Sequence, residues 1–159
     1  MQPQFTEVLT LIQSAQQKVL ANTNQELIKL YWSIGKYISD RMTASEWGQK
    51  TIEQLAAFIQ AQEPGIKGFE KRNFERMRQF YETYPDSQIT TALRTQLSWT
   101  HHRIIMSRCK SEAERLFYLE LAATERYSTR ELDDLRSVVD HRQINSGIFE
   151  RTRLASHLN

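Results

Sequence analysis

Basic side chains and an amide gather in the segment GIKGFEKRNFERMR, residues 65–78. Arginine can donate two hydrogen bonds to guanine, asparagine can pair with adenine, and lysine neutralises phosphate. The segment therefore carries the chemistry of nucleic-acid contact, and the candidate contact residues are Lys67, Lys71, Arg72, Asn73 and Arg76. The alternative is an ordinary solvated helix face, because Glu70 and Glu75 lie among these residues.

A second candidate is the segment LSWTHHR, residues 97–103, inside a stretch from 87 to 111 that holds no acidic residue. Its tryptophan could stack on a base, and Arg103, Arg108 and Lys110 could form a secondary patch that neutralises phosphates. Adjacent histidines on a helix point about 100° apart, so His101 and His102 cannot grip one metal ion together. The alternative is that Trp99 and one of the two histidines belong to the core.

The sequence offers little to catalysis. Five glycines form no phosphate-binding or dinucleotide-binding loop, and the single cysteine, Cys109, lies in an apolar helix as a buried hydrophobe would. Pro85-Asp86 begins like a PD-(D/E)xK nuclease motif, yet no acidic residue in the chain is followed two positions later by lysine. We therefore expect no catalytic residue, metal, cofactor or small-molecule substrate; an enzyme would need His101 or His102 beside Glu120 or Glu125.

The elements that position these residues are predicted to be helices. Only 5 Gly and 3 Pro interrupt the chain, and apolar residues recur at the i, i+3, i+4 spacing of a helix face. We predict an all-α fold of about seven helices, with a helical hairpin over residues 5–41 followed by a helix-turn-helix-like bundle. Capping-box spacings mark helix starts at Thr23–Glu26, Thr43–Glu46, Ser111–Glu114 and Ser128–Glu131, and Ser98 is a further cap.

Two pairs of predicted helices have the helix-turn-helix pattern. In the first pair, a helix that ends near Gln62 is followed by Pro64-Gly65 and Gly68, and the next helix begins with the basic segment. The second pair covers residues 111–125 and 128–139, but its second helix carries Glu131, Asp133 and Asp134. Acidic residues disfavour DNA, so protein contact or internal packing is the better interpretation of the second pair.

The polar segment 86–97 is the best boundary between two subdomains. We predict a first region over residues 1–86, a second helical subdomain over 87–140 packed on the first, and a basic tail or linker over 141–159. The N-terminus lacks the pattern of a secretory signal, and no apolar run approaches the roughly 20 residues of a membrane span. A single cysteine fits a reducing compartment, and we expect a cytoplasmic bacterial protein without membrane association.

Six segments in order carry a resemblance to a known family: LIQSAQQKVLANTNQELIKLYWSIGKYI, EWGQKTIEQLA, PGIKGFEKRNFERMRQFYETYPD, QLSWTHHRIIMS, ERLFYLELAATERYSTRELDDLR and SGIFERTRLA. Together they cover almost the whole chain, which resembles the N-terminal domain of the YhcG-like proteins, bacterial proteins with a PD-(D/E)xK nuclease domain. The resemblance implies a helical module for DNA binding or assembly beside a nuclease-like domain. That domain is expected beyond this chain, so the resemblance transfers no catalytic residue onto it.

The leading expectation is a non-catalytic DNA-binding or DNA-targeting module of a nuclease-like protein. The alternative is an oligomerisation or partner-binding module, in which the apolar stripe of the 5–41 hairpin extends across a two-fold interface to form a homodimer.

Overall fold

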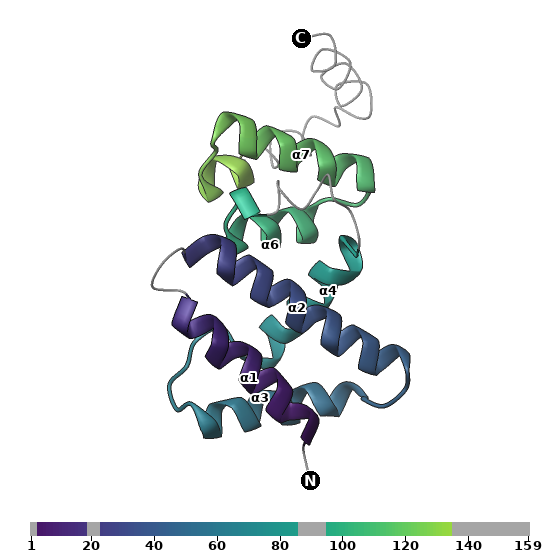
Figure 1. Cartoon of the computed structure of the whole chain (residues 1–159). Coiled ribbons are helices and arrows are strands. Elements are labelled where there is room, and N and C mark those ends of the chain that lie inside the picture. The colour runs from purple at the N-terminus through teal and green to yellow at the C-terminus, as the bar shows by residue number, and fades with distance from the viewer. Residues whose placement is uncertain (1–2, 19–22, 86–94, 135–159) are drawn as a thin grey trace. The chain divides into compact units, whose positions relative to one another are not determined.

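The structure, a computed structural model, describes residues 3–18, 23–85 and 95–134. It confirms the all-α prediction: within these ranges the ordered elements are helices and no strand is present. The labelled helices are α1 (Pro3–Lys18), α2 (Thr23–Thr43), α3 (Gln49–Gln62), α4 (Lys71–Thr83), α6 (Trp99–Arg108) and α7 (Glu112–Glu125) (Figure 1). Residues 129–134 are also helical. The predicted tail, 141–159, lies outside the described residues.

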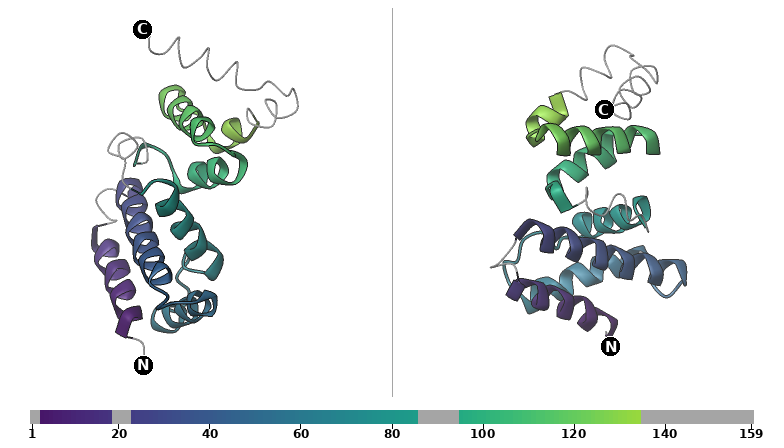
Figure 2. Two further views of the ribbon diagram at one scale, coloured as in Figure 1. Left: turned by 90° about the vertical axis from the view of Figure 1, so that its right-hand side faces the viewer. Right: turned by 45° about the horizontal axis from the view of Figure 1, so that its top comes forward.

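The chain divides into two compact units, Met1–Thr90 and Thr91–Asn159. In unit 1, α1 and α2 run antiparallel as a hairpin, and α2 lies between α1 and α4 (Figures 1 and 2). The inward stripe of α1 is buried against its neighbours; it consists of Phe5, Val8, Leu9, Ile12 and Ala15. The apolar stripe of α1 is therefore covered within one chain.

The packing of α4 on α2 depends on a glycine. A Cβ atom added at Gly35 in the middle of α2 would lie 2.0 Å from the carbonyl oxygen of Met77. The two backbones can approach so closely only because Gly35 has no side chain. Around this crossing, α4 buries Phe74, Met77 and Phe80 completely. The buried stripe fixes which side of α4 faces outward, and this decides the side chains that α4 can offer to a ligand.

The connection between α2 and α3 corrects one prediction. Thr43 does not cap a new helix, since α2 continues to Thr43 and α3 starts only at Gln49. The backbone amides of Glu46 and Trp47 donate to the carbonyl of Arg41, and the start of α3 is capped by the Thr51 hydroxyl, which accepts from the amide of Gly48. The buried Trp47 ring decides this geometry: its indole N–H bonds the side chain of Gln4, and it packs edge-on against Phe5 and Tyr37.

In unit 2 the predicted serine caps are present. The hydroxyls of Ser98, Ser111 and Ser128 accept from the amides of His101, Glu114 and Glu131, three residues further on. The Glu131 carboxylate also accepts from the amide of Ser128, which completes a capping box. Each cap satisfies helix-terminal N–H groups that have no partner inside the helix. The helices of unit 2 therefore start where their own sequences specify.

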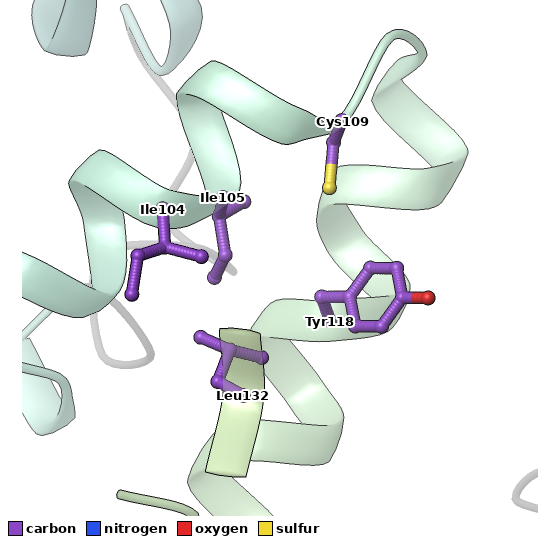
Figure 3. A pocket seen from close by; sticks show the side chains of 5 residues that line it. All are labelled: Ile104, Ile105, Cys109, Tyr118 and Leu132. Carbon is purple, nitrogen blue, oxygen red and sulfur yellow. The ribbon is translucent and has the colours of Figure 1, made fainter. Parts of the chain in front are cut away.

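The core of unit 2 closes around a small apolar hollow. Its walls are Ile104 and Ile105 of α6, Cys109 after it, Tyr118 of α7 and Leu132 of the 129–134 segment (Figure 3). All of the facing groups are hydrocarbon, sulfur or aromatic, and the hollow leaves no room for a ligand. Cys109 is buried, as predicted for a cysteine that serves as a hydrophobe.

Candidate nucleic-acid interface

The first turn of α4 presents positive charge to solvent. Lys71 and Arg72 open the helix and are exposed, and the turn contains no acidic residue. The residue before them, Glu70, makes no side-chain cap hydrogen bond to the helix. A helix N-terminus carries about half a positive charge from its peptide dipoles, so two cations there cost helix stability. The same arrangement creates a positive surface that an anion would neutralise.

The turn before α4 has a defined shape. Gly65 and Gly68 adopt φ angles of +83° and +92°, in the region that favours glycine over residues with a side chain. The side-chain amide of Gln60 donates to the carbonyl of Ile66 at 3.0 Å, and the amide of Gly68 donates to the Glu70 carboxylate at 3.1 Å. Lys67 lies exposed between these anchored points. Its backbone is therefore held by the turn while its ammonium group is free to reach a ligand.

Asn73 does not have the role expected for it. Its side chain is 8% exposed, and its amide donates to the carbonyl of Gly68 at 2.6 Å. Asn73 also shares a hydrogen bond with the Tyr31 hydroxyl, which lies directly against Gly68. Because this side chain is buried and bonds both the Gly68 carbonyl and the Tyr31 hydroxyl, it is not available to pair with the edge of an adenine base. Asn73 therefore holds the turn, and we remove it from the set of base-contacting candidates.

Tyr31 of α2 is a supporting residue that the sequence did not single out. Burial raises the pKa of Tyr31, the hydrogen bond to Asn73 lowers it in part, and the charge of Glu70 raises it further. The hydroxyl thus keeps its proton at neutral pH. Its ring packs edge-on against Phe69, which in turn packs on Phe74. The only local signal was the place of Tyr31 on the apolar stripe of its helix; nothing there indicates contact with a turn about 40 residues away.

Further along α4 the exposed side chains are mixed. Arg76 and Arg78 are half-buried at the two flanks of the outward face. The guanidinium of Arg78 donates to the Glu82 carboxylate at 2.8 Å, which neutralises much of its charge. Glu75 is exposed between the basic residues. The positive surface is therefore concentrated in the turn and the first helical turn, at Lys67, Lys71 and Arg72, with Arg76 beside them.

The three residues of the predicted secondary patch lie in unit 2 and differ in their exposure to solvent. Arg103 is half-buried, whereas Arg108 and Lys110 are exposed. Arg108 forms an ion pair with Asp133 at 3.1 Å, so part of its charge is already balanced within the unit. Trp99 is 9% exposed and belongs to the core, which leaves no ring face for stacking on a base. His102 is fully buried, which confirms that one of the two histidines is a core residue.

His101 has a structural role at the start of α6. Its Nδ1 accepts from the backbone amide of Ser98 at 3.2 Å, and its Nε2 lies 2.7 Å from the carbonyl of Tyr127. A neutral imidazole with its proton on Nε2 satisfies both contacts. Since both ring nitrogens bond to groups other than a carboxylate, His101 is not arranged as half of an acid–base pair with Glu120 or Glu125. It ties the start of α6 to the turn after α7.

The comparisons place the chain in a family. The model of the DUF1016 N-terminal domain matches residues 7–151. The chain belongs to this family. It is the N-terminal part of the YhcG-like proteins that the sequence resembles, and no nuclease domain is matched in this chain. Neither the curated proteins nor the solved structures contain a match.

Within the described ranges, no group of three or more His, Cys, Asp or Glu side chains comes together as a metal site. In the same ranges, no helix combines the length and apolarity that crossing a membrane requires. The candidate functional site of this DUF1016 domain is therefore the basic start of α4 with the turn that supports it.

Proposed function

We propose that this DUF1016 N-terminal domain is a non-catalytic DNA-binding module that helps to target a nuclease-like protein. The observation that supports this is the pair of exposed cations, Lys71 and Arg72, in a first helical turn that holds no acidic residue, after an N-cap residue, Glu70, whose side chain does not cap the helix. Selection for stability alone would favour the opposite charge at this position. A polyanionic ligand gives the arrangement a purpose.

The surroundings of α4 also fit a helix-turn-helix. The helix follows α3 through a turn that contains two glycines with positive φ, it packs on both α2 and α3, and its first turn faces outward. Helix-turn-helix proteins bring the first residues of their second helix to the DNA in the same way. Lys67, Lys71, Arg72 and Arg76 form the proposed primary contact. Arg103, Arg108 and Lys110 form the proposed secondary patch.

Fluorescence anisotropy with a labelled DNA duplex, across a salt series, tests the proposal. We expect binding at low salt that weakens as salt rises, because counterions are released from the DNA when the protein binds. The variant Lys71→Ala/Arg72→Ala/Arg76→Ala should bind at least about a hundredfold more weakly at low salt. In the secondary patch, Arg103→Ala/Lys110→Ala should have a smaller effect.

The matched control is Lys29→Ala/Lys36→Ala/Lys50→Ala, which removes three exposed lysines of unit 1 from α2 and α3. It lowers the net charge by the same amount but leaves the start of α4 intact. If the control weakens binding as strongly as the α4 variant, the contact is not located at α4. The absence of binding at low salt would overturn the proposal as a whole.

A further inference from the structure

The outward face of α4 changes character along its length. The exposed residues of the helix are Lys71, Arg72, Glu75, Gln79 and Glu82. The two positive charges lie in the first turn, and both charges that follow are negative. Arg78, at the flank, is paired with Glu82, which also accepts from the hydroxyl of Ser39 at 2.9 Å. At the start of the helix, Lys67, Lys71 and Arg72 outnumber the one exposed carboxylate there, Glu70, which accepts from the Gly68 amide, so the net positive charge of α4 lies at an end of the helix and not along its side.

A helix that reads sequence lies in the major groove and presents hydrogen-bonding side chains to base edges, between two rows of phosphates. The side of α4 is poorly suited to that position. Glu75 would approach the phosphates with like charge, and the paired Arg78 and Glu82 offset each other and add no net positive charge to this side. The amide of Asn73, the side chain best suited to adenine, is held by the carbonyl of Gly68. Base readout along α4 is therefore disfavoured by both charge and hydrogen bonding.

We infer that α4 meets DNA end-on, with Lys67, Lys71 and Arg72 neutralising backbone phosphates and without readout of base edges. This inference rests on the proposed function and specifies its ligand as the phosphodiester backbone of duplex DNA, whatever its sequence. Phosphate contacts position a protein on the duplex but carry no sequence information. This domain would then give the nuclease-like protein affinity for DNA, and selectivity for a sequence would come from another part of the protein or from a partner.

The supporting turn suits this role. Lys67 lies on the turn and Lys71 on the helix, so their separation depends on the geometry of Gly68, which the Tyr31 hydroxyl and the Asn73 amide hold in place. A turn that is fixed before binding loses less conformational entropy when the phosphates dock. Tyr31 and Asn73 act here as positioning residues: they order the cations without touching the ligand.

The test is anisotropy on the full chain with several duplexes of equal length and unrelated mixed sequence. We expect dissociation constants that agree within about threefold at each salt concentration, since specific proteins prefer their site by about a thousandfold or more. In Lys71→Ala/Arg72→Ala, the slope of log K against log salt should become shallower by about 1.8, because each lost phosphate contact contributes about 0.9. Lys29→Ala/Lys50→Ala, matched in charge, should leave the slope unchanged.

Two further variants separate phosphate contact from base contact. Lys71→Arg/Arg72→Lys keeps both charges and exchanges their hydrogen-bonding geometry, so it should bind all the duplexes as the original chain does. Glu75→Gln should strengthen binding about twofold to threefold on every duplex, because it removes a like charge beside the phosphates. Far-UV circular dichroism verifies that each variant is folded; all of these positions are exposed.

The outcomes distinguish this inference from the proposed function. A preference of tenfold or more for one sequence would overturn end-on phosphate contact and leave DNA binding standing. Loss of DNA binding in Lys71→Arg/Arg72→Lys would have the same meaning. An unchanged salt slope in Lys71→Ala/Arg72→Ala would also overturn the inference. The absence of binding to any duplex at low salt would overturn both.

Discussion

Two of the connections that lead into a helix in the described residues, the one before α4 and the one after α7, are stabilised differently. In the connection from α7 to the 129–134 segment, the helix start is capped locally: Arg126 adopts a left-handed conformation, and Ser128 and Glu131 form a capping box, while His101 contacts the Tyr127 carbonyl. The connection from α3 to α4 has no such cap at its helix start, which carries Lys71 and Arg72 instead. Its turn is held by hydrogen bonds of Gln60, Glu70 and Asn73, and Tyr31 and Gly35 of α2 support it from the neighbouring helix.

This difference separates two demands on a helix start. The start at Ser128 satisfies its amides and complements the helix dipole with Glu131, as stability alone would require. The start at Lys71 opposes the dipole and depends on tertiary contacts to hold it in place. A protein retains such a start where the positive charge has a use, which is the physical basis for the proposal that α4 contacts DNA. Four substitutions test the contrast.

The largest expected effect belongs to Gly35→Ala. The new methyl group would lie 2.0 Å from the Met77 carbonyl oxygen, a backbone atom that cannot rotate away. The α2–α4 crossing must open, and we expect a loss of about 3 kcal/mol in the free energy of unfolding, the upper end for overpacked cores. Urea denaturation followed by circular dichroism measures it. Gly48→Ala is the control, because a Cβ there meets nothing within 4 Å; an equal loss in both variants would contradict the crossing argument.

The turn itself is tested by comparing its two glycines. Both have positive φ, so an alanine at either position costs about 1–2 kcal/mol in backbone strain. A Cβ at Gly65 meets nothing, whereas a Cβ at Gly68 would lie 2.7 Å from the buried Tyr31 hydroxyl. Gly68→Ala should therefore destabilise unit 1 by about 1 kcal/mol more than Gly65→Ala, the order of one lost hydrogen bond. Equal losses would show that Tyr31 does not support the turn.

Local capping in unit 2 should be worth less. Ser128→Ala removes the acceptor of the Glu131 amide, and we expect a loss of about 1 kcal/mol in unfolding free energy. Thr124→Ala, an exposed substitution on α7, should change stability by less than about 0.5 kcal/mol. Thermal or urea unfolding monitored by circular dichroism compares the two. A Ser128→Ala protein as stable as the Thr124→Ala protein would show that the capping box adds nothing.

The features that depend on local contacts could be predicted from the sequence, and those that depend on tertiary contacts could not. The caps at Ser98, Ser111 and Ser128 were found because donor and acceptor lie three residues apart, within reach of a local pattern. The same pattern was misleading at Thr43, where the chain leaves α2 so that Trp47 is buried against Tyr37 of that helix and against Phe5 of α1, far away in the chain. Asn73 was misassigned for a similar reason: its partners are a turn carbonyl and Tyr31, and no spacing within the basic segment indicates them.

The substitution with the smallest expected change in stability gives the sharpest test, because it should make the protein more stable and at the same time weaken its binding to DNA. Lys71→Glu replaces a cation at the helix start with an anion, so it should stabilise the protein by about 0.3–1 kcal/mol. The same substitution should weaken DNA binding at least about tenfold, since it exchanges attraction to a phosphate for repulsion.

Gln79→Glu is the control for Lys71→Glu, because it adds negative charge on the same face of α4 away from the helix start. It should leave stability within about 0.5 kcal/mol of the original chain. In unit 2, Glu131→Lys should instead destabilise the start at Ser128, where no compensating gain in binding is expected. A Lys71→Glu protein that is more stable and binds DNA less well would show that α4 gives up stability for its positive charge. A variant that is more stable and binds DNA as before would mean that the contrast between the two helix starts has no functional meaning.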